Sequence, residues 1–251
     1  MTVPLSLTTH LASRSTTFFR EHLAEDIAVA DAADEVGYSQ FHFTRLFTSA
    51  VGVSPGRYLT AVRFERAKQL LLTERFNVRD ICHQVGFTSP ATFTRRFAAD
   101  VTVAPAALRR LADRIGDTTI TGFTLPGPRG GPTVTGRVRI GESFRRLVGD
   151  NPSIWIGTFA QPTPSGRPVT GTLIHGDGHF AVPLAGAPWL LAAAIPAAAD
   201  PLAQLGSGAP LVAIHPAPLT DPATVDLELG PAAPWSFPLL TALPSLYFET
   251  I

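Results

Sequence analysis

Cysteine is almost absent from this chain of 251 residues, which contains one, Cys82. A single cysteine excludes an internal disulfide and most zinc-finger designs. The sequence also lacks a phosphate-binding loop, a serine nucleophile elbow and a paired-carboxylate motif. We therefore expect no catalytic residue, no cofactor and no metal ion.

Long apolar runs are scarce as well. The opening segment MTVPLSLTTHLASRS contains no apolar stretch long enough for a secretory signal. The run from Trp189 to Ala199 is interrupted by Pro196 and is too short to span a bilayer. These features predict a cytoplasmic protein with no membrane partner.

Charge is sparse and balanced, but the balance conceals two unequal parts. Residues 1–115 contain 14 Lys+Arg against 11 Asp+Glu, which gives +3, whereas residues 116–251 contain 6 against 9, which gives −3. The first part holds 4 of the 23 prolines and 4 of the 21 glycines. We expect a helical domain over 1–115 and a turn-rich domain over 116–251, with the positive charge on the helical domain.

The helical domain contains a diverged internal repeat. The segment VGYSQFHFTRLFTSAVGVSP, residues 36–55, returns as VGFTSPATFTRRFAADVTVAP, residues 85–105. A recurring segment of this size indicates one supersecondary unit that is used twice. The residues that recur at an offset of 50 are Phe43, Thr44, Arg45, Phe47, Val51, Val53 and Pro55.

The first copy has the pattern of two helices joined by a tight turn. Residues 27–36 carry apolar side chains at helical spacing. Gly37 can adopt the left-handed conformation that ends a helix, and Ser39 is suited to cap the next one. Phe43 and Phe47 are expected on the inner face of that second helix.

The second copy repeats the pattern over a helix at residues 78–85. Gly86 provides the turn, and Thr88 or Ser89 provides the cap. Pro90 follows at a first-turn position, where its missing N–H costs nothing. Two helices joined by a short glycine turn are typical of the helix-turn-helix, whose second helix enters the DNA major groove.

Residues from about 20 to 110 resemble the DNA-binding region of the AraC family of transcription regulators. That family shows a pattern similar to I-A-x-x-V-G-F-x-x-x-x-x-F-x-R-x-F. The resemblance implies two helix-turn-helix units, a long bridging helix over residues 58–74 and double-stranded DNA as the partner. The matching residues are Ile81, Val85, Gly86, Phe87, Phe93, Arg95 and Phe97.

Several positions depart from the family pattern. Cys82 replaces a usual alanine, a change between small residues. Thr102 stands where glycine is usual, which predicts a tighter or reshaped turn. Ala104 and Leu108 replace a usual threonine and tyrosine, so the final helix is expected to pack differently.

The outward faces of the two second helices are the expected DNA-binding surface. Arginine can bond bidentately to guanine, although Arg45 and Arg95 could instead be solvated or paired with a neighbouring helix. An outward phenylalanine at position 41 suits a thymine methyl, unless it packs on the first helix. The residues expected to face DNA are Gln40, Phe41, Thr44, Arg45, Ala91, Thr92, Thr94 and Arg95.

The second half has an extended rather than a helical pattern. Short runs with strand character alternate with proline and glycine, which predicts a β-sandwich or a small barrel. Asp177-Gly178 is expected to form a hairpin turn, and residues 142–148 a short helix. The expected strands are Thr119–Thr124, Thr133–Ile140, Ile154–Phe159, Val169–Ile174, His179–Pro183, Trp189–Ile195, Leu211–His215, Thr224–Leu229 and Leu246–Glu249. The predicted fold is an all-α double helix-turn-helix domain followed by a β-sandwich-like domain.

A metal site in the second half has one weak sequence signal. His175, Asp177 and His179 alternate, so an extended strand would point all three side chains to one side. The glycines on either side of Asp177 favour a turn that scatters them instead. We therefore predict no metal site.

The leading hypothesis is a sequence-specific transcription regulator whose β-rich half binds a small-molecule effector or a partner. The alternatives are an enzymatic β-rich half fused to a DNA-binding module and a half that serves only to form a homodimer. No effector-binding residue is assigned. Aromatic side chains in this half are expected to line an apolar pocket or a dimer face: Trp155, Phe159, Phe180, Trp189, Trp235, Phe237, Tyr247 and Phe248.

Overall fold

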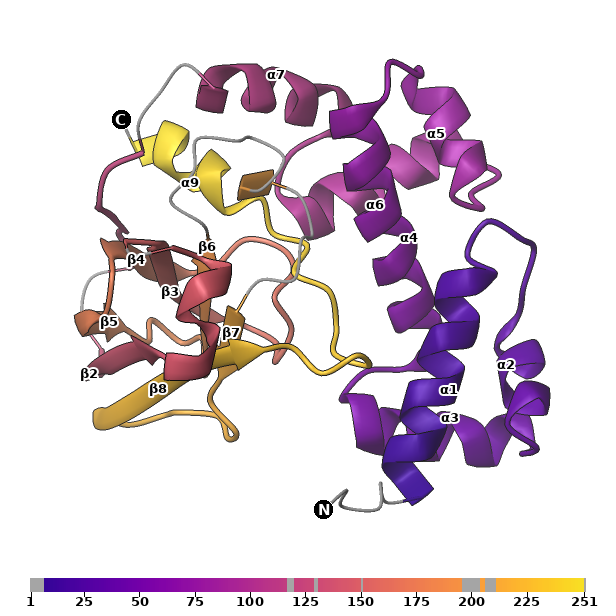
Figure 1. Ribbon diagram of the computed structural model, residues 1–251, viewed down its shortest axis with the longest axis horizontal. Helices are drawn as coiled ribbons and strands as arrows, with labels where there is room; N and C mark the ends of the chain where they lie inside the picture. The colour runs from indigo at the N-terminus through magenta and orange to yellow at the C-terminus, as the bar shows by residue number, and fades with distance from the viewer. Residues whose placement is uncertain are drawn as a thin grey trace.

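The computed structural model describes residues 7–116, 120–128, 131–149, 151–195, 204–205 and 211–250. A group of helices lies beside a curled sheet (Figure 1). The helices of the first half are α1 (Leu7–Glu21), α2 (Val29–Glu35), α3 (Gln40–Val51), α4 (Pro55–Thr73), α5 (Val78–Gln84), α6 (Pro90–Val101) and α7 (Pro105–Gly116).

Helices α1 to α7, residues 7–116, make up what we call the helical half. Helix α4 runs through the middle of the helical half and includes most of the long helix expected over residues 58–74 (Figure 1). It begins with Pro55 in its first turn, where the missing N–H of proline costs nothing. Eleven of its residues are buried, including Tyr58 and Phe64. A helix buried around its circumference packs against neighbours on several sides, so α4 holds the surrounding helices together.

The glycine turns and serine caps expected in both copies are confirmed. Between α2 and α3, Gly37 has a φ of 76°, and Ser39 Oγ accepts a hydrogen bond from the amide of His42 at 3.4 Å. Between α5 and α6, Gly86 has a φ of 78°, and Ser89 Oγ accepts from the amide of Thr92 at 3.3 Å. The cap of the second copy is therefore Ser89 rather than Thr88.

The turn at Thr102 is not reshaped, contrary to the sequence-based expectation. Thr102 has a φ of 78°, close to the 82° of Gly52, its counterpart in the first copy. A β-branched residue rarely adopts this left-handed conformation. The Thr102 side chain lies 3.1 Å from Ser245 Oγ, a contact that ties this turn to the second half.

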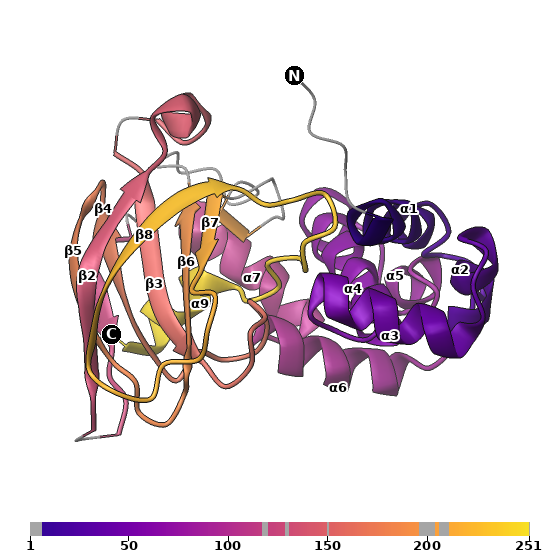
Figure 2. The same ribbon diagram turned by 90° about the horizontal axis from the view of Figure 1, so that it is seen from below.

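The second half is built on a single mixed sheet that curls on itself (Figure 2). The strand order is β1-β4-β3-β6-β7-β8-β2-β5, and every neighbouring pair is antiparallel except β2 with β8. The elements are β1 (Phe123–Leu125), β2 (Thr133–Ile140), the 3₁₀ helix η1 (Glu142–Leu147), β3 (Ser153–Phe159), β4 (Thr170–His175), β5 (Gly178–Pro183), β6 (Trp189–Ile195), β7 (Leu211–Ile214), β8 (Ala223–Pro231) and α9 (Leu243–Thr250).

The expectation of a β-rich second half is confirmed, but a β-sandwich is not, because the described strands form one curled sheet, closer to the small barrel that was the other expectation. The alternation of buried and exposed side chains along β2 was visible in the sequence. The parallel pairing of β2 with β8, in which Val134 lies opposite Ala223, joins segments about ninety residues apart. Local patterns do not reveal such a pairing.

The strand expected at Leu246–Glu249 was also wrong, since these residues belong to helix α9. Leu243 and Leu246 are three residues apart and face one way on a helix, so both are buried against Trp155 and Leu173 of the sheet. Short apolar runs do not distinguish a strand from a helix. Among the described helices, none is long and apolar enough to cross a membrane.

A segment that we call the strap, residues 232–242, joins β8 to α9 and binds the helical half. The ammonium of Lys68 on α4 donates to the carbonyl oxygens of Leu239 and Leu240, each at 3.1 Å. The amide of Ala242 donates to the carbonyl oxygen of Val101 at 2.9 Å. The strap is therefore bonded both to α4 and to the end of α6.

Lys68, the only lysine in the sequence, is 1% exposed. Burial lowers the pKa of its ammonium from 10.5 to about 8, although nearby Glu65 acts in the opposite direction. At a pH between these two pKa values, Lys68 is therefore protonated more fully in the unfolded chain than in the folded chain. The free energy of unfolding should rise as the pH increases from about 8, since the buried charge is lost.

We expect this rise to be on the order of 2 kcal/mol between pH 7 and 9.5 and to be absent in Lys68→Met. Urea denaturation of the wild-type protein and of Lys68→Met at several pH values in this range gives the free energy of unfolding of each as a function of pH. Other titrating groups are common to both proteins and cancel. Parallel pH profiles would contradict the assignment of the effect to Lys68.

Candidate nucleic-acid interface

The outward face of α3 carries the residues expected from the first copy. Gln40 and Arg45 are exposed and Thr44 is half-buried. Phe41 is 83% exposed, so it does not pack against α2 as the alternative interpretation required. An exposed phenylalanine on a helix surface is available to contact a ligand.

The outward face of α6 carries the counterparts from the second copy. Ala91 and Arg95 are exposed, whereas Thr92 and Thr94 are half-buried. In the part of the chain that the structure describes, neither Arg45 nor Arg95 forms a hydrogen bond or ion pair with a neighbouring helix, so both guanidinium groups can contact a ligand. Pro90 and Ala91 offer no side-chain donor, so this helix has fewer polar groups than α3.

Two further residues of this surface escaped the sequence interpretation. Thr48 and Ser49 are exposed and line one shallow depression together with Phe41, Thr44 and Arg45. They lie four residues after Thr44 and Arg45, one helical turn further along the same face. Helical spacing alone could therefore have identified them.

Helices α3 and α6 lie on the same side of the helical half. Both run along its lower edge in Figure 2, whereas Figure 1 shows them separated along the length of α4. The eight expected residues are thus distributed over two helices that share one side of the molecule. This arrangement leaves the curled sheet beside the helices.

The charge of both helices favours an anionic ligand. Helix α3 contains Arg45 and no acidic residue. The one acidic residue of α6, Asp100, is bound by Arg57 of α4 through two contacts of 2.5 and 2.8 Å. The positive ends of the helix dipoles at the two serine caps add to the same effect.

Aromatic contacts hold the two helices against α4. The ring of Phe64 meets those of Phe93 and Phe97 edge to face, with centroids 5.9 and 5.5 Å away. Tyr58 meets Phe47 of α3 in the same way at 5.7 Å. Because α4 supports both helices with fully buried rings, their outward side chains project from a rigid base.

The aromatic residues of the second half separate into different environments. Trp155, Phe159 and Phe237 line a cavity near the helical half. Phe180 instead belongs to the core on the other face of the sheet. Phe248 of α9 lies against the helical half, with its ring centre 3.9 Å from the guanidinium carbon of Arg114.

The alternating histidines and aspartate of the second half do not gather around one point. The Asp177 carboxylate is bound by the Arg145 guanidinium and accepts a hydrogen bond from the amide of Ile140 at 3.1 Å. His175 Nδ1 lies 3.4 Å from Ser153 Oγ. Among the described residues, no group of three or more His, Cys, Asp or Glu side chains is placed to hold a metal ion.

Cys82 is fully buried on the inner side of α5, and burial raises the pKa of its thiol. A thiol with a raised pKa is a poor nucleophile at neutral pH. Its contacts are those of a small core residue among Phe64, Ile81 and Val85.

Comparison with known proteins finds similarity in the helical half. Residues 32–111 match a family described as a helix-turn-helix domain. The lactose operon transcription activator of Staphylococcus xylosus is 32% identical over 92 residues, which cover 37% of this chain and 33% of that protein. The transcriptional regulator Rob of Salmonella typhimurium is 32% identical over 92 residues, which cover 37% of this chain and 32% of that protein.

The matched segments therefore span about a third of the length of these relatives. Among solved structures, the C-terminal domain of AraT, a response regulator from Geobacillus stearothermophilus, is similar with 25% identity and a TM-score of 0.40. That similarity covers 43% of this chain and 88% of the AraT domain.

Proposed function

We propose, from the match of residues 32–111 to a helix-turn-helix family, that the protein is an AraC-type, sequence-specific transcription regulator that reads duplex DNA with both α3 and α6. The observation that carries the proposal is that the two helices lie on the same side of the helical half (Figure 2). Each carries an exposed arginine, Arg45 on α3 and Arg95 on α6. Both relatives described above are transcription regulators by name.

The proposed DNA-facing residues are the eight expected from the repeat, with Thr48 and Ser49 added. Arg45 and Arg95 would contact a guanine edge or a phosphate, and Phe41 a thymine methyl. The modest charge of +3 over residues 1–115 makes base contacts and shape important beside phosphate contacts. In this proposal, residues 1–115 bind DNA and residues 116–251 receive the regulatory signal.

Footprinting of the full chain tests the use of both helices. A duplex selected from a random library should show two protected patches about one helical turn apart, on one side of the DNA, since each reading helix enters its own major groove. One short patch would mean that α6 has a structural role alone. Hydroxyl-radical cleavage gives the resolution needed to separate the two patches.

A further inference from the structure

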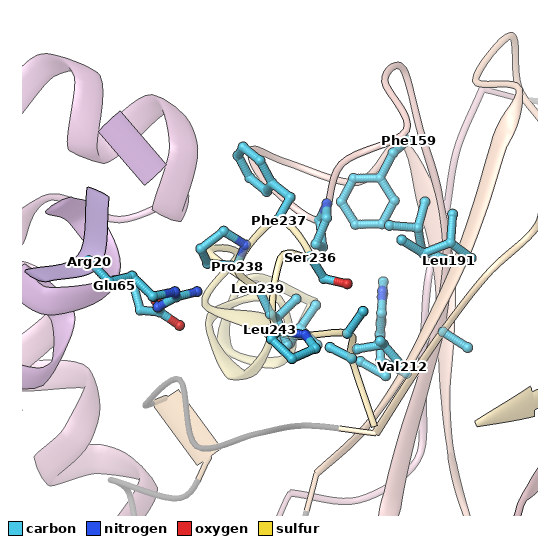
Figure 3. Close-up of a pocket in the computed structure, with 18 residues that line it drawn as sticks. Arg20, Glu65, Phe159, Leu191, Val212, Ser236, Phe237, Pro238, Leu239 and Leu243 are labelled. Carbon is cyan, nitrogen blue, oxygen red and sulfur yellow. The ribbon is translucent and has the colours of Figure 1, made fainter. Parts of the chain in front are cut away.

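A cavity of about 270 Å³ lies between the strap and the sheet. Figure 3 shows Phe237 and Leu239 of the strap on one side of it and Leu191 and Val212 of the sheet on the other. Ligand sites in proteins commonly measure about 300–1,000 Å³. A cavity slightly below that range suits a compact molecule with few atoms.

The walls of this cavity are mostly apolar. Trp155 lines the cavity and is 1% exposed, and its indole Nε1 has no hydrogen-bond partner among the described residues. That nitrogen is itself buried behind the cavity wall, so a bound molecule would meet the apolar atoms that line the cavity. The site therefore suits a molecule with an apolar body.

The end of the cavity toward the helical half is charged. Arg20 of α1 and Glu65 of α4 form an ion pair of 2.5 Å, and both line the cavity (Figure 3). Lys68, which bonds the strap, also interacts electrostatically with Glu65. Two cations around one carboxylate leave a net positive charge, which favours an anionic group on the ligand.

The strap connects this cavity to the helices that carry the proposed DNA-facing residues. Phe237 packs against the buried cores around both α3 and α6, and its ring centre lies 5.3 Å from the guanidinium carbon of Arg57. Arg57 in turn binds Asp100 near the end of α6 and Ser165 of the second half. A molecule in the cavity would therefore touch a segment that contacts α4 and α6 directly.

We propose that this cavity is the effector site, that its ligand is a small apolar carboxylic acid, and that the strap transmits its occupancy to α4 and α6. This inference rests on the proposed function, because it supplies the regulatory input for DNA binding. The acid's apolar body would contact the strap and the sheet, and its carboxylate would face Arg20. Binding at the cavity and binding of DNA would then be reciprocally coupled.

Benzoate, phenylacetate and hexanoate, each compared with its neutral amide, test the proposal on the full chain. All three tryptophans lie in residues 116–251, so their emission reports binding in the second half. At least one acid should change the emission saturably and shift the Kd for the selected duplex fivefold or more. Its amide should bind at least tenfold more weakly, and Arg20→Gln should remove this preference.

Ala233→Leu provides a variant that narrows the cavity at a partly exposed strap position. It should lose both the emission change and the Kd shift, whereas Ala181→Leu, on the exposed side of β5, should retain both. Equal binding of acid and amide, persistence of both effects in Ala233→Leu, or an emission change without a Kd shift would overturn the proposal. So would the absence of any response to the three acids.

These outcomes are distinct from failure of the proposed function. That function fails if the full chain without any acid does not bind a selected duplex. The effector inference fails if duplex binding is intact and independent of the acids. Measuring the duplex Kd before and after each titration separates the two.

Discussion

Gly86→Ala is expected to destabilise the helical half strongly, whereas Gly37→Ala should destabilise it only slightly. Both glycines make the turn of a helix pair with nearly the same φ, 78° and 76°. A Cβ at position 86 would lie 2.6 Å from the carbonyl oxygen of Leu23 and 2.8 Å from Nη2 of Arg63. A Cβ at position 37 would meet nothing within 4 Å.

The left-handed conformation alone costs an alanine about 1 kcal/mol, the loss expected for Gly37→Ala. At position 86 the Cβ must also displace the Arg63 guanidinium, which donates to the carbonyl oxygens of Leu23 and Glu25. We expect a total loss on the order of 3 kcal/mol or more for Gly86→Ala. Urea denaturation followed by far-ultraviolet circular dichroism measures both; equal losses would show that the backbone conformation alone matters.

Arg45→Ala is expected to weaken specific DNA binding by about 1–3 kcal/mol and to relax discrimination at one base position. Arg45 is exposed on a helix that carries several other polar groups. Arg95→Ala should cost a similar amount. Pro90 and Ala91 leave α6 with fewer polar side chains that can contact bases. Arg45→Ala should therefore relax specificity more than any single change at Ala91 or Thr92.

Affinity measured on the selected duplex and on its single-base variants, at several salt concentrations, gives the role of each arginine. A uniform loss on all duplexes with a shallower salt dependence would identify a phosphate contact. Arg137→Ala is the matched control, because it removes the same charge from an exposed position on β2, in the second half. If Arg45→Ala and Arg137→Ala behave alike, Arg45 lies outside the interface.

Much of the helical half followed from the sequence because its signals are local. The caps at Ser39 and Ser89 and the turns at Gly37 and Gly86 depend on residues within one helical turn. The exposed positions of Phe41, Arg45 and Arg95 follow from the inward positions of neighbouring phenylalanines on the same helices. The repeat reinforced each of these inferences, because two copies had to satisfy one pattern.

The second half followed less well because its decisive contacts are distant in sequence. Most strands were located from alternation and turn residues, but their assembly into one curled sheet depends on the pairing of β2 with β8. Helix α9 was mistaken for a strand because its helical conformation is stabilised by burial against Trp155 and Leu173. No local pattern contains that information.

The sequence by itself determined the two helix pairs and which of their side chains face outward. The tertiary structure decided where Lys68, the strap and the cavity lie. Lys68 is buried because the carbonyl oxygens of Leu239 and Leu240, about 170 residues away, accept its hydrogen bonds. Hydrogen bonds within a helix or turn join near neighbours and leave a signature in the sequence, whereas a cavity requires walls brought together from separate segments by the fold.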